Sequence, residues 1–255
     1  MKKAIIYTLA FIAIQLIASF LVPAIWGLFA EKTVHNSPAI LIVTMALVSV
    51  VILTVFLLLH WAEVSRQWMR TRPWIVLTWC VLAALGAIIP SIWFQEQMPE
   101  LPNIVEQEFD MILKERWGYL VIGLLAPLSE ELVFRGAVLR ALLQWNNHHW
   151  LCIFVSALFF SLVHGNPAQM PHAFLIGLLL GWLYYRTGSI IPGVVFHWVN
   201  NTVAYVMYNL YPDPSLRLVD LFGGSQRHVA TAVLFSLFIL LPALYQLNLH
   251  MKKAA

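Results

Sequence analysis

Long apolar stretches follow one another along almost the whole chain, separated by short polar connections. A helix needs about 20 apolar residues to cross the roughly 30 Å of hydrocarbon in a bilayer. By this measure the pattern predicts about eight spans, at Ala4–Phe29, Pro38–His60, Pro73–Phe94, Tyr119–Trp145, Trp150–His164, Pro171–Tyr185, Ile190–Tyr211 and Val229–Leu247. The fifth and sixth are short, so we expect them to tilt toward buried neighbours or to extend through their connecting loops.

The continuity of these runs excludes membrane-spanning strands, which are shorter and alternate between apolar and polar side chains. Composition agrees, because 61% hydrophobic against 11% charged residues lies far outside the range of soluble domains. We therefore expect an all-α fold, a polytopic transmembrane helical bundle. Residues 1–255 would form a single integral membrane domain in contact with the lipid bilayer.

The basic residues predict how the bundle is oriented. An even number of spans puts both termini on one side, and that side collects ten of the fifteen Lys and Arg residues: Lys2, Lys3, Arg66, Arg70, Arg72, Arg135, Arg140, Arg186, Lys252 and Lys253. Cytoplasmic segments carry the excess of basic residues, so we expect both termini in the cytoplasm. The net charge of +3 is then a topology signal and does not indicate nucleic-acid binding. Because the sequence shows no organelle signal, we expect a bacterial plasma membrane.

The longest polar connection runs from Gln95 to Gly118 on the opposite side. Apolar residues recur in it at helical spacing, namely Ile104, Val105, Phe109, Ile112 and Leu113. This spacing predicts a helix along the membrane surface. We interpret it as an interfacial connector, with a substrate gate as the alternative.

Ionisable and amide side chains gather in three spans, where burying a charge costs several kcal/mol. The fourth span carries Glu130, Glu131 and Arg135, the fifth ends on His164, and the seventh carries His197, Asn200 and Asn201. Glu131 and Arg135 are four residues apart, so they share a helix face and can form an ion pair. Glu130 points about 100° away from Glu131, which leaves its carboxylate for chemistry.

His197 and Asn201 are also four apart and both can donate hydrogen bonds from one helix face. Two fixed donors suit an oxyanion hole, while a structural polar pair between helices is the alternative. His164 is the candidate for acid and base work, because its proton affinity lies near operating pH. At a rise of about 1.5 Å per residue, His164 and Glu130 reach similar depths, but His197 and Asn201 join them only if helices tilt or re-enter.

The remaining polar and special residues have simpler interpretations. We expect solvated or interfacial side chains for His35, His60, His148, His149, His172, His228 and His250. Cys80 and Cys152 fall in apolar spans and should be small buried side chains. Gly177 would let neighbouring helices approach closely, and Pro127 is placed to kink or begin a helical segment just before the two glutamates.

The stretch from Ala126 to Gly136 resembles the EExxxR motif of the CAAX protease and bacteriocin-processing (CPBP, or Abi) family. Phe160–His164 resembles the second motif of that family, FxxxH, and Gly177–Asn201 resembles its third region with an HxxxN ending. Together the motifs cover about residues 119–205, the protease-like core. Their order and their placement within apolar spans make the resemblance specific.

The resemblance implies a glutamic intramembrane endopeptidase, similar to type II CAAX prenyl endopeptidases, acting on a membrane-associated peptide or protein. Glu130 and His164 would activate water, while His197 and Asn201 would hold the oxyanion. Glu131 and Arg135 would support and orient the site. The substrate would be of the CAAX type or a peptide that undergoes maturation, and the sequence leaves open whether it is prenylated.

Three other functions stay open at this point. A zinc metalloprotease could use Glu130, His164 and His197 as ligands, although no HExxH pairing is present. Without that zinc, no cofactor is expected. A membrane scaffold or immunity protein could keep the fold without turnover. A proton-coupled transporter would also bury Glu, Arg and His, but the sequence shows no paired interrupted helices. The oligomeric state is open.

Overall fold

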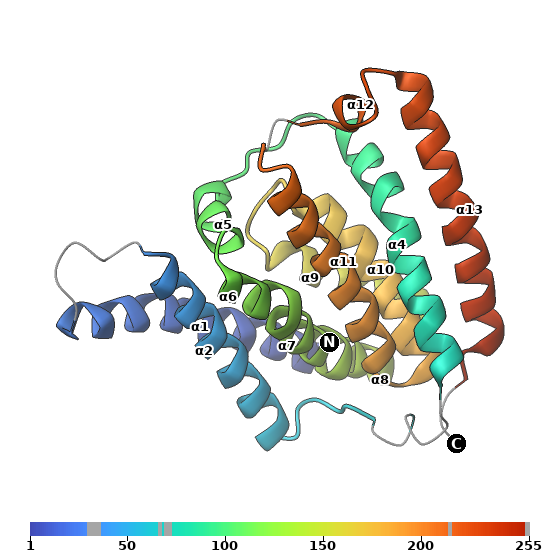
Figure 1. The fold of residues 1–255 in the computed structure, drawn as a ribbon. Helices are drawn as coiled ribbons and strands as arrows, with labels where there is room; N and C mark the ends of the chain where they lie inside the picture. Colours follow the sequence, from blue (N-terminus) through green and yellow to red (C-terminus); the bar gives the residue numbers. More distant parts are fainter. Residues whose placement is uncertain (30–36, 66–67, 69–72, 214–215, 253–255) are drawn as a thin grey trace.

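The computed structural model describes residues 1–29, 37–65, 68, 73–213 and 216–252, and these contain helices but no strand (Figure 1). The helices are α1 (Lys2–Phe29), α2 (Pro38–Leu58), α4 (Trp74–Glu96), α5 (Glu106–Leu113), α6 (Arg116–Tyr119), η2 (Leu120–Leu125), α7 (Ala126–Val133), η3 (Phe134–Leu139), α8 (Arg140–Trp145), α9 (His149–Leu162), α10 (Met170–Thr187), α11 (Ile191–Leu210), α12 (Leu218–Leu221) and α13 (Gln226–His250). The predicted all-α class is confirmed. Several residues used above lie outside the described part, namely His35, Arg66, Arg70, Arg72 and Lys253.

Each predicted span corresponds to a helix or a run of helices. Five are long and apolar enough to cross a membrane: α1, α2, α4, the continuous run Arg116–Trp145, and α13. The other three are α9, α10 and α11, with 14, 18 and 20 residues. Large apolar side chains on the outer helices are exposed, such as Phe20 and Leu28 at 75% and 78%. In a bilayer these faces contact lipid, so the described helices form an integral membrane bundle.

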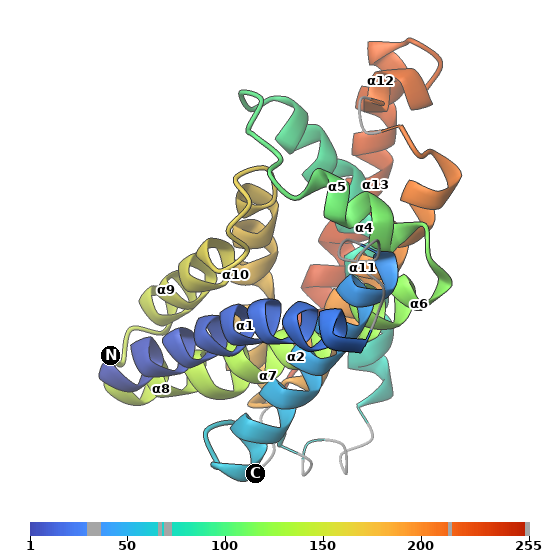
Figure 2. The ribbon, with the colours of Figure 1, turned by 90° about the vertical axis from the view of Figure 1, so that its left-hand side faces the viewer.

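The helices pack into two groups with separate apolar cores. The first core joins α1, α2, α9 and the α7–α8 run, and the second joins α4, α10, α11 and α13. Figures 1 and 2 show α4 and α13 lying side by side along the edge of the bundle. The groups meet where α9 packs on α10. A Cβ at Gly177 would lie 3.0 Å from Ala157 Cβ, so the predicted close approach of this helix is confirmed.

The run from α6 to α8 is irregular around the two glutamates. Short π-helical segments, η2 and η3, flank α7, which begins at Ala126 with Pro127 in its first turn. The Ala126 N–H bonds the carbonyl of Val121, five residues back. Such widened turns leave carbonyl groups for partners outside the helix. As expected from the sequence, Pro127 therefore marks the start of a new helical segment.

The predicted surface helix in the connection Gln95–Gly118 is α5. Ile112 of α5 packs on Val121 and Ile122 of η2. Polar contacts join α5 and the residues after it to α11, including Tyr208 Oη to the Asp110 carboxylate and Asn209 Nδ2 to the Leu113 carbonyl at 3.1 Å. The segment before α5 is held by Asn166, as described below. Because α5 bonds to α11 and the segment before α5 bonds to Asn166, α5 is held against the end of α11.

Both ends of the described chain lie on the same side of the bundle. Met1 and Trp145 line one cleft beside α8, and Arg140 of α8 forms an ion pair with Glu63. Near the C-terminus, on the same side, Arg186 Nη2 donates to the carbonyl of Asn248 at 2.8 Å. Figure 2 shows α5 and α12 toward the opposite end. An even number of spans requires such an arrangement, while the assignment of that side to the cytoplasm stays a prediction.

Candidate active site

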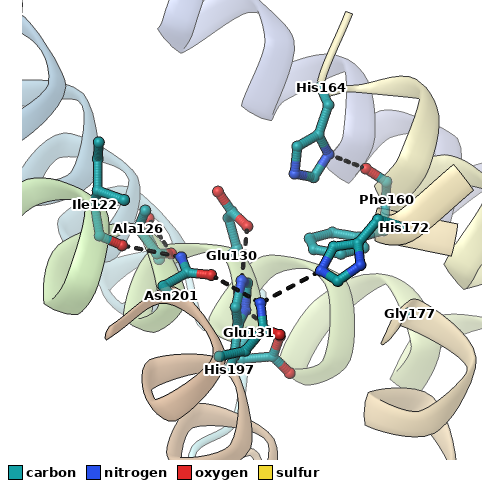
Figure 3. A network of polar contacts seen from close by, with 12 residues as sticks. Ile122, Ala126, Glu130, Glu131, Phe160, His164, His172, Gly177, His197 and Asn201 are labelled. Atoms are coloured by element: carbon teal, nitrogen blue, oxygen red, sulfur yellow. Dashed lines mark hydrogen bonds and ion pairs between the residues drawn. The ribbon is translucent and has the colours of Figure 1, made fainter. Parts of the chain in front are cut away.

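A cavity of 590 Å³ lies between the two groups of helices and beneath α5. Glu130 of α7, His164 after α9, and His197 and Asn201 of α11 all line it. The structure thus brings together the four residues that the sequence proposed as one site (Figure 3). Their convergence removes the mismatch in depth that arises when every span is treated as perpendicular to the membrane.

Beneath the cavity floor, Glu131 and Arg135 form the predicted ion pair. Arg135 Nη1 donates to Glu131 Oε1 at 2.8 Å, and the two side chains are 1% and 0% exposed. Arg135 Nη2 donates to the Gly177 carbonyl at 3.3 Å, and its guanidinium carbon lies 4.4 Å from the centre of the Phe160 ring. Two buried charges therefore compensate each other, with hydrogen-bonding and cation–π contacts on the arginine side.

His197 is held by the same carboxylate. Its Nδ1–H donates to Glu131 Oε1 at 3.1 Å, while Nε2 lies 3.8 Å from Glu130 Oε2. A carboxylate on one ring nitrogen orients the imidazole and favours a proton on that nitrogen. Glu131 therefore links Arg135 to His197, and the other ring nitrogen is directed toward Glu130 and the cavity.

His164 is oriented by its own helix. Its Nδ1–H donates to the carbonyl of Phe160, one turn earlier, at 2.7 Å. The imidazole also meets the Phe160 ring edge to face, with 4.9 Å between the ring centres. Because Nδ1 carries the proton, the neutral ring presents the lone pair of Nε2. Figure 3 shows the side chains of His164 and Glu130 bordering the same open space.

Asn201 is anchored by the irregular turn of η2. Since the Ala126 N–H bonds Val121, the next donor for this widened turn would be residue 127, but Pro127 has no N–H. The Ile122 carbonyl is therefore left for a partner from another helix. Asn201 Nδ2 donates to it at 3.0 Å. A proline in the first turn of α7 thus positions an amide of α11.

His172 and Asn200 are among the polar residues that line the cavity although the sequence assigned them no part in the site. The expectation that His172 is solvated or interfacial is wrong. The turn after α9 brings the start of α10 back against the cavity, and His172 Nε2 lies 3.5 Å from Asn200 Nδ2. The sequence signal that could have placed His172 in the site is its position directly after Pro171, at the start of the span that follows His164.

Both cysteines, Cys80 and Cys152, are buried, as predicted.

The zinc alternative receives no geometric support. Within the described residues, no three His, Cys, Asp or Glu side chains converge closely enough to share a metal ion. Glu130, His164 and His197 line one cavity, yet their donor atoms do not form a coordination set. Tetrahedral zinc requires all its ligands at about 2.0–2.3 Å from one point.

A second cavity, of 610 Å³, adjoins the first between α1, α2 and the end of α9. Glu130 and His164 line both cavities. The second is bordered mainly by apolar side chains from the outer helices, among them Phe11, Leu16, Val48, Ile52 and Leu162. The carboxylate and the imidazole therefore lie where the two cavities meet.

Comparison with known proteins agrees with this geometry. Residues 113–203 match the family described as type II CAAX prenyl endopeptidase Rce1-like. The chain is 23% identical over 184 residues to UPF0177 protein YbdI of Lactococcus lactis subsp. lactis (strain IL1403), which covers 69% of this chain and 98% of the relative. It is 33% identical over 84 residues to an uncharacterized 24.3 kDa protein of Escherichia coli, which covers 31% of this chain and 38% of the relative. No solved structure matches.

The matched segment contains the cavity residues Glu130, His164, His197 and Asn201 and the ion pair beneath them. The resemblance that the sequence motifs indicated is confirmed by this match. Proteases form the family, and its matched helices lie within a membrane bundle. Through residues 113–203 the chain is therefore similar to the Rce1-like family of type II CAAX prenyl endopeptidases.

Proposed function

We propose that the chain is an intramembrane endopeptidase that hydrolyses a peptide bond of a membrane-associated protein or peptide. The observation that carries the proposal is the convergence of Glu130, His164, His197 and Asn201, from separate motifs of a protease family, on one cavity. Intramembrane ionisable residues are costly, so a cluster of them facing a cavity indicates function.

Glu130 and His164 would activate the attacking water. His164 Nε2 has a lone pair directed away from the Phe160 carbonyl, and it accepts a proton from water as the oxygen attacks the scissile carbonyl carbon. The Glu130 carboxylate orients that water by accepting its second hydrogen. When the C–N bond breaks, the proton passes to the nitrogen of the leaving amine. The products are one carboxylic acid and one amine.

His197 and Asn201 would stabilise the oxyanion that forms on the carbonyl oxygen. Asn201 gives one amide hydrogen to Ile122 and keeps the other for the cavity. His197 uses Nδ1–H on Glu131, so Nε2 donates to the oxyanion when the ring carries both protons. Fixed donors aimed at developing charge are worth about 10²–10³ in kcat each.

The substrate would lie across the junction of the two cavities. Its apolar part would occupy the crevice between α1, α2 and α9, and the scissile bond would reach Glu130 and His164. The family description supports a CAAX-type substrate with a prenyl group, and peptide maturation is the alternative. We place the protein in a bacterial plasma membrane with cytoplasmic termini, following its basic residues and its bacterial relatives.

The test uses purified protein in liposomes with fluorescence-quenched peptides, some ending in a farnesylated CAAX sequence and some unmodified. We expect Glu130→Gln and His164→Ala to lower kcat by about 10² or more. Glu100→Gln, on an exposed carboxylate outside the cavity, is the matched control and should behave as wild type. Equal cleavage by wild type and Glu130→Gln would reject the mechanism.

The same preparation separates the other functions. Full cleavage after exhaustive chelation argues against a zinc enzyme, whereas loss of cleavage restored by zinc argues for one. If Glu130→Gln abolishes cleavage but a cellular phenotype survives, the scaffold or immunity role explains that phenotype.

A further inference from the structure

Three polar side chains, His172, Asn200 and Asn201, contact one another in sequence along the cavity. His172 Nε2 lies 3.5 Å from Asn200 Nδ2, which in turn lies 3.4 Å from Asn201 Oδ1. Asn201 then donates to the Ile122 carbonyl at 3.0 Å. Figure 3 shows His172 and Asn201 at opposite ends of the contacts made by Asn200. The contacts therefore connect the start of α10 to the amide proposed to hold the oxyanion.

The orientation of the Asn200 amide makes it the donor in both contacts. An amide NH₂ has two hydrogens, so Asn200 can donate to His172 Nε2 and to Asn201 Oδ1 together. His172 Nε2 must then be unprotonated. Asn200 is only 8% exposed, so little solvent competes for its amide. The Asn201 amide is consequently held at its oxygen by Asn200 and through one hydrogen by Ile122, which leaves its second hydrogen for the cavity.

We propose that His172 is a positioning residue that acts through Asn200 to orient Asn201. The proposal rests on the function proposed above, because it assigns His172 a role in holding the oxyanion donor. Without an acceptor at Nε2, the Asn200 amide can rotate, and its hold on Asn201 Oδ1 is lost. A donor misplaced by about 1 Å can cost about 10²-fold in rate.

The test measures kcat and KM of wild type and of His172 variants with the farnesylated CAAX peptide in liposomes. We expect His172→Leu to lower kcat by about 10- to 100-fold, with KM changed by less than about 2-fold. His172→Gln, whose amide oxygen can replace the Nε2 acceptor, should recover most of the lost kcat. His148→Leu makes the same substitution on the exposed side chain before α9 and is the matched control.

A double-mutant cycle distinguishes positioning from general damage to the fold. With Asn201→Ala present, His172 has no amide left to orient, so adding His172→Leu should change kcat by less than about 2-fold. The inference would be overturned if the kcat losses of Asn201→Ala and His172→Leu multiply in the double variant. Equal kcat losses in His172→Leu and His172→Gln would also overturn it. If Glu130→Gln is inactive while His172→Leu matches wild type, only this inference fails. If wild type cleaves no peptide, or Glu130→Gln cleaves normally, the proposed function fails and the inference fails with it.

Discussion

Replacing Gly193 by alanine tests whether Glu131 positions His197. Gly193 lies one turn before His197 on α11, and a Cβ there would be 2.6 Å from Glu131 Oε2. Ordinary contact begins at 3.4 Å, so the carboxylate must retreat by about 0.8 Å, the difference between these distances. Such a retreat would stretch the 3.1 Å contact from His197 Nδ1 to Glu131 beyond hydrogen-bonding range.

Two effects of Gly193→Ala follow from this displacement. Overpacking a dense interior costs about 1–3 kcal/mol of stability. Without its hydrogen bond to Glu131, His197 is no longer held in place, and a shift of its ring by about 1 Å should lower kcat by about 10²-fold with little change in KM. Alanine favours the helix over glycine by about 1 kcal/mol, so helix propensity does not explain a loss of stability or of kcat.

The assay measures peptide cleavage in liposomes and thermal unfolding in detergent, with Gly86→Ala as the control. A Cβ at Gly86 would lie 2.7 Å from the backbone nitrogen of Leu240, between α4 and α13 and away from the cavity. We expect Gly86→Ala to lose stability and to keep kcat. A kcat for Gly193→Ala within about 3-fold of wild type, at comparable loss of stability, would refute the reasoning.

Three further predictions concern the elements around the cavity. Pro127→Ala supplies an N–H that competes with Asn201 for the Ile122 carbonyl, so kcat should fall by about 10-fold without loss of melting temperature; unchanged kcat would contradict this. Asn166→Ala removes the bonds at 2.8 and 3.1 Å that hold the segment before α5, which should cost about 1–3 kcal/mol and speed proteolysis there; an unchanged cleavage rate would count against it. The contacts of Asp110 with Lys114 and Tyr208 lower the pKa of its carboxyl group, so its support of α5 is present above its ordinary pKa near 4 and lost as pH falls through the lowered pKa. Hydrogen exchange in α5 should therefore rise below about pH 4 in wild type, and Asp110→Asn should lack this dependence.

The pattern of apolar runs predicted the fold class and the positions of the spans well, because each transmembrane helix satisfies its own backbone hydrogen bonds. Helical spacing predicted the Glu131–Arg135 pair for the same local reason. The motifs selected Glu130, His164, His197 and Asn201, which the structure brings to one cavity. Their chemical roles stay predictions until the variants are assayed.

The sequence by itself therefore determined the class of the bundle, the resemblance of residues 113–203 to a protease family and the identity of the main polar residues, since these depend on hydrophobicity and local spacing. Only the tertiary structure decided that His172 and Asn200 belong to the cavity and that Gly193 leaves space for Glu131. It also decided that Pro127 frees a carbonyl for Asn201. These features depend on contacts between different helices, whose tilt and separation are set by packing and cannot be obtained from the period of any single helix.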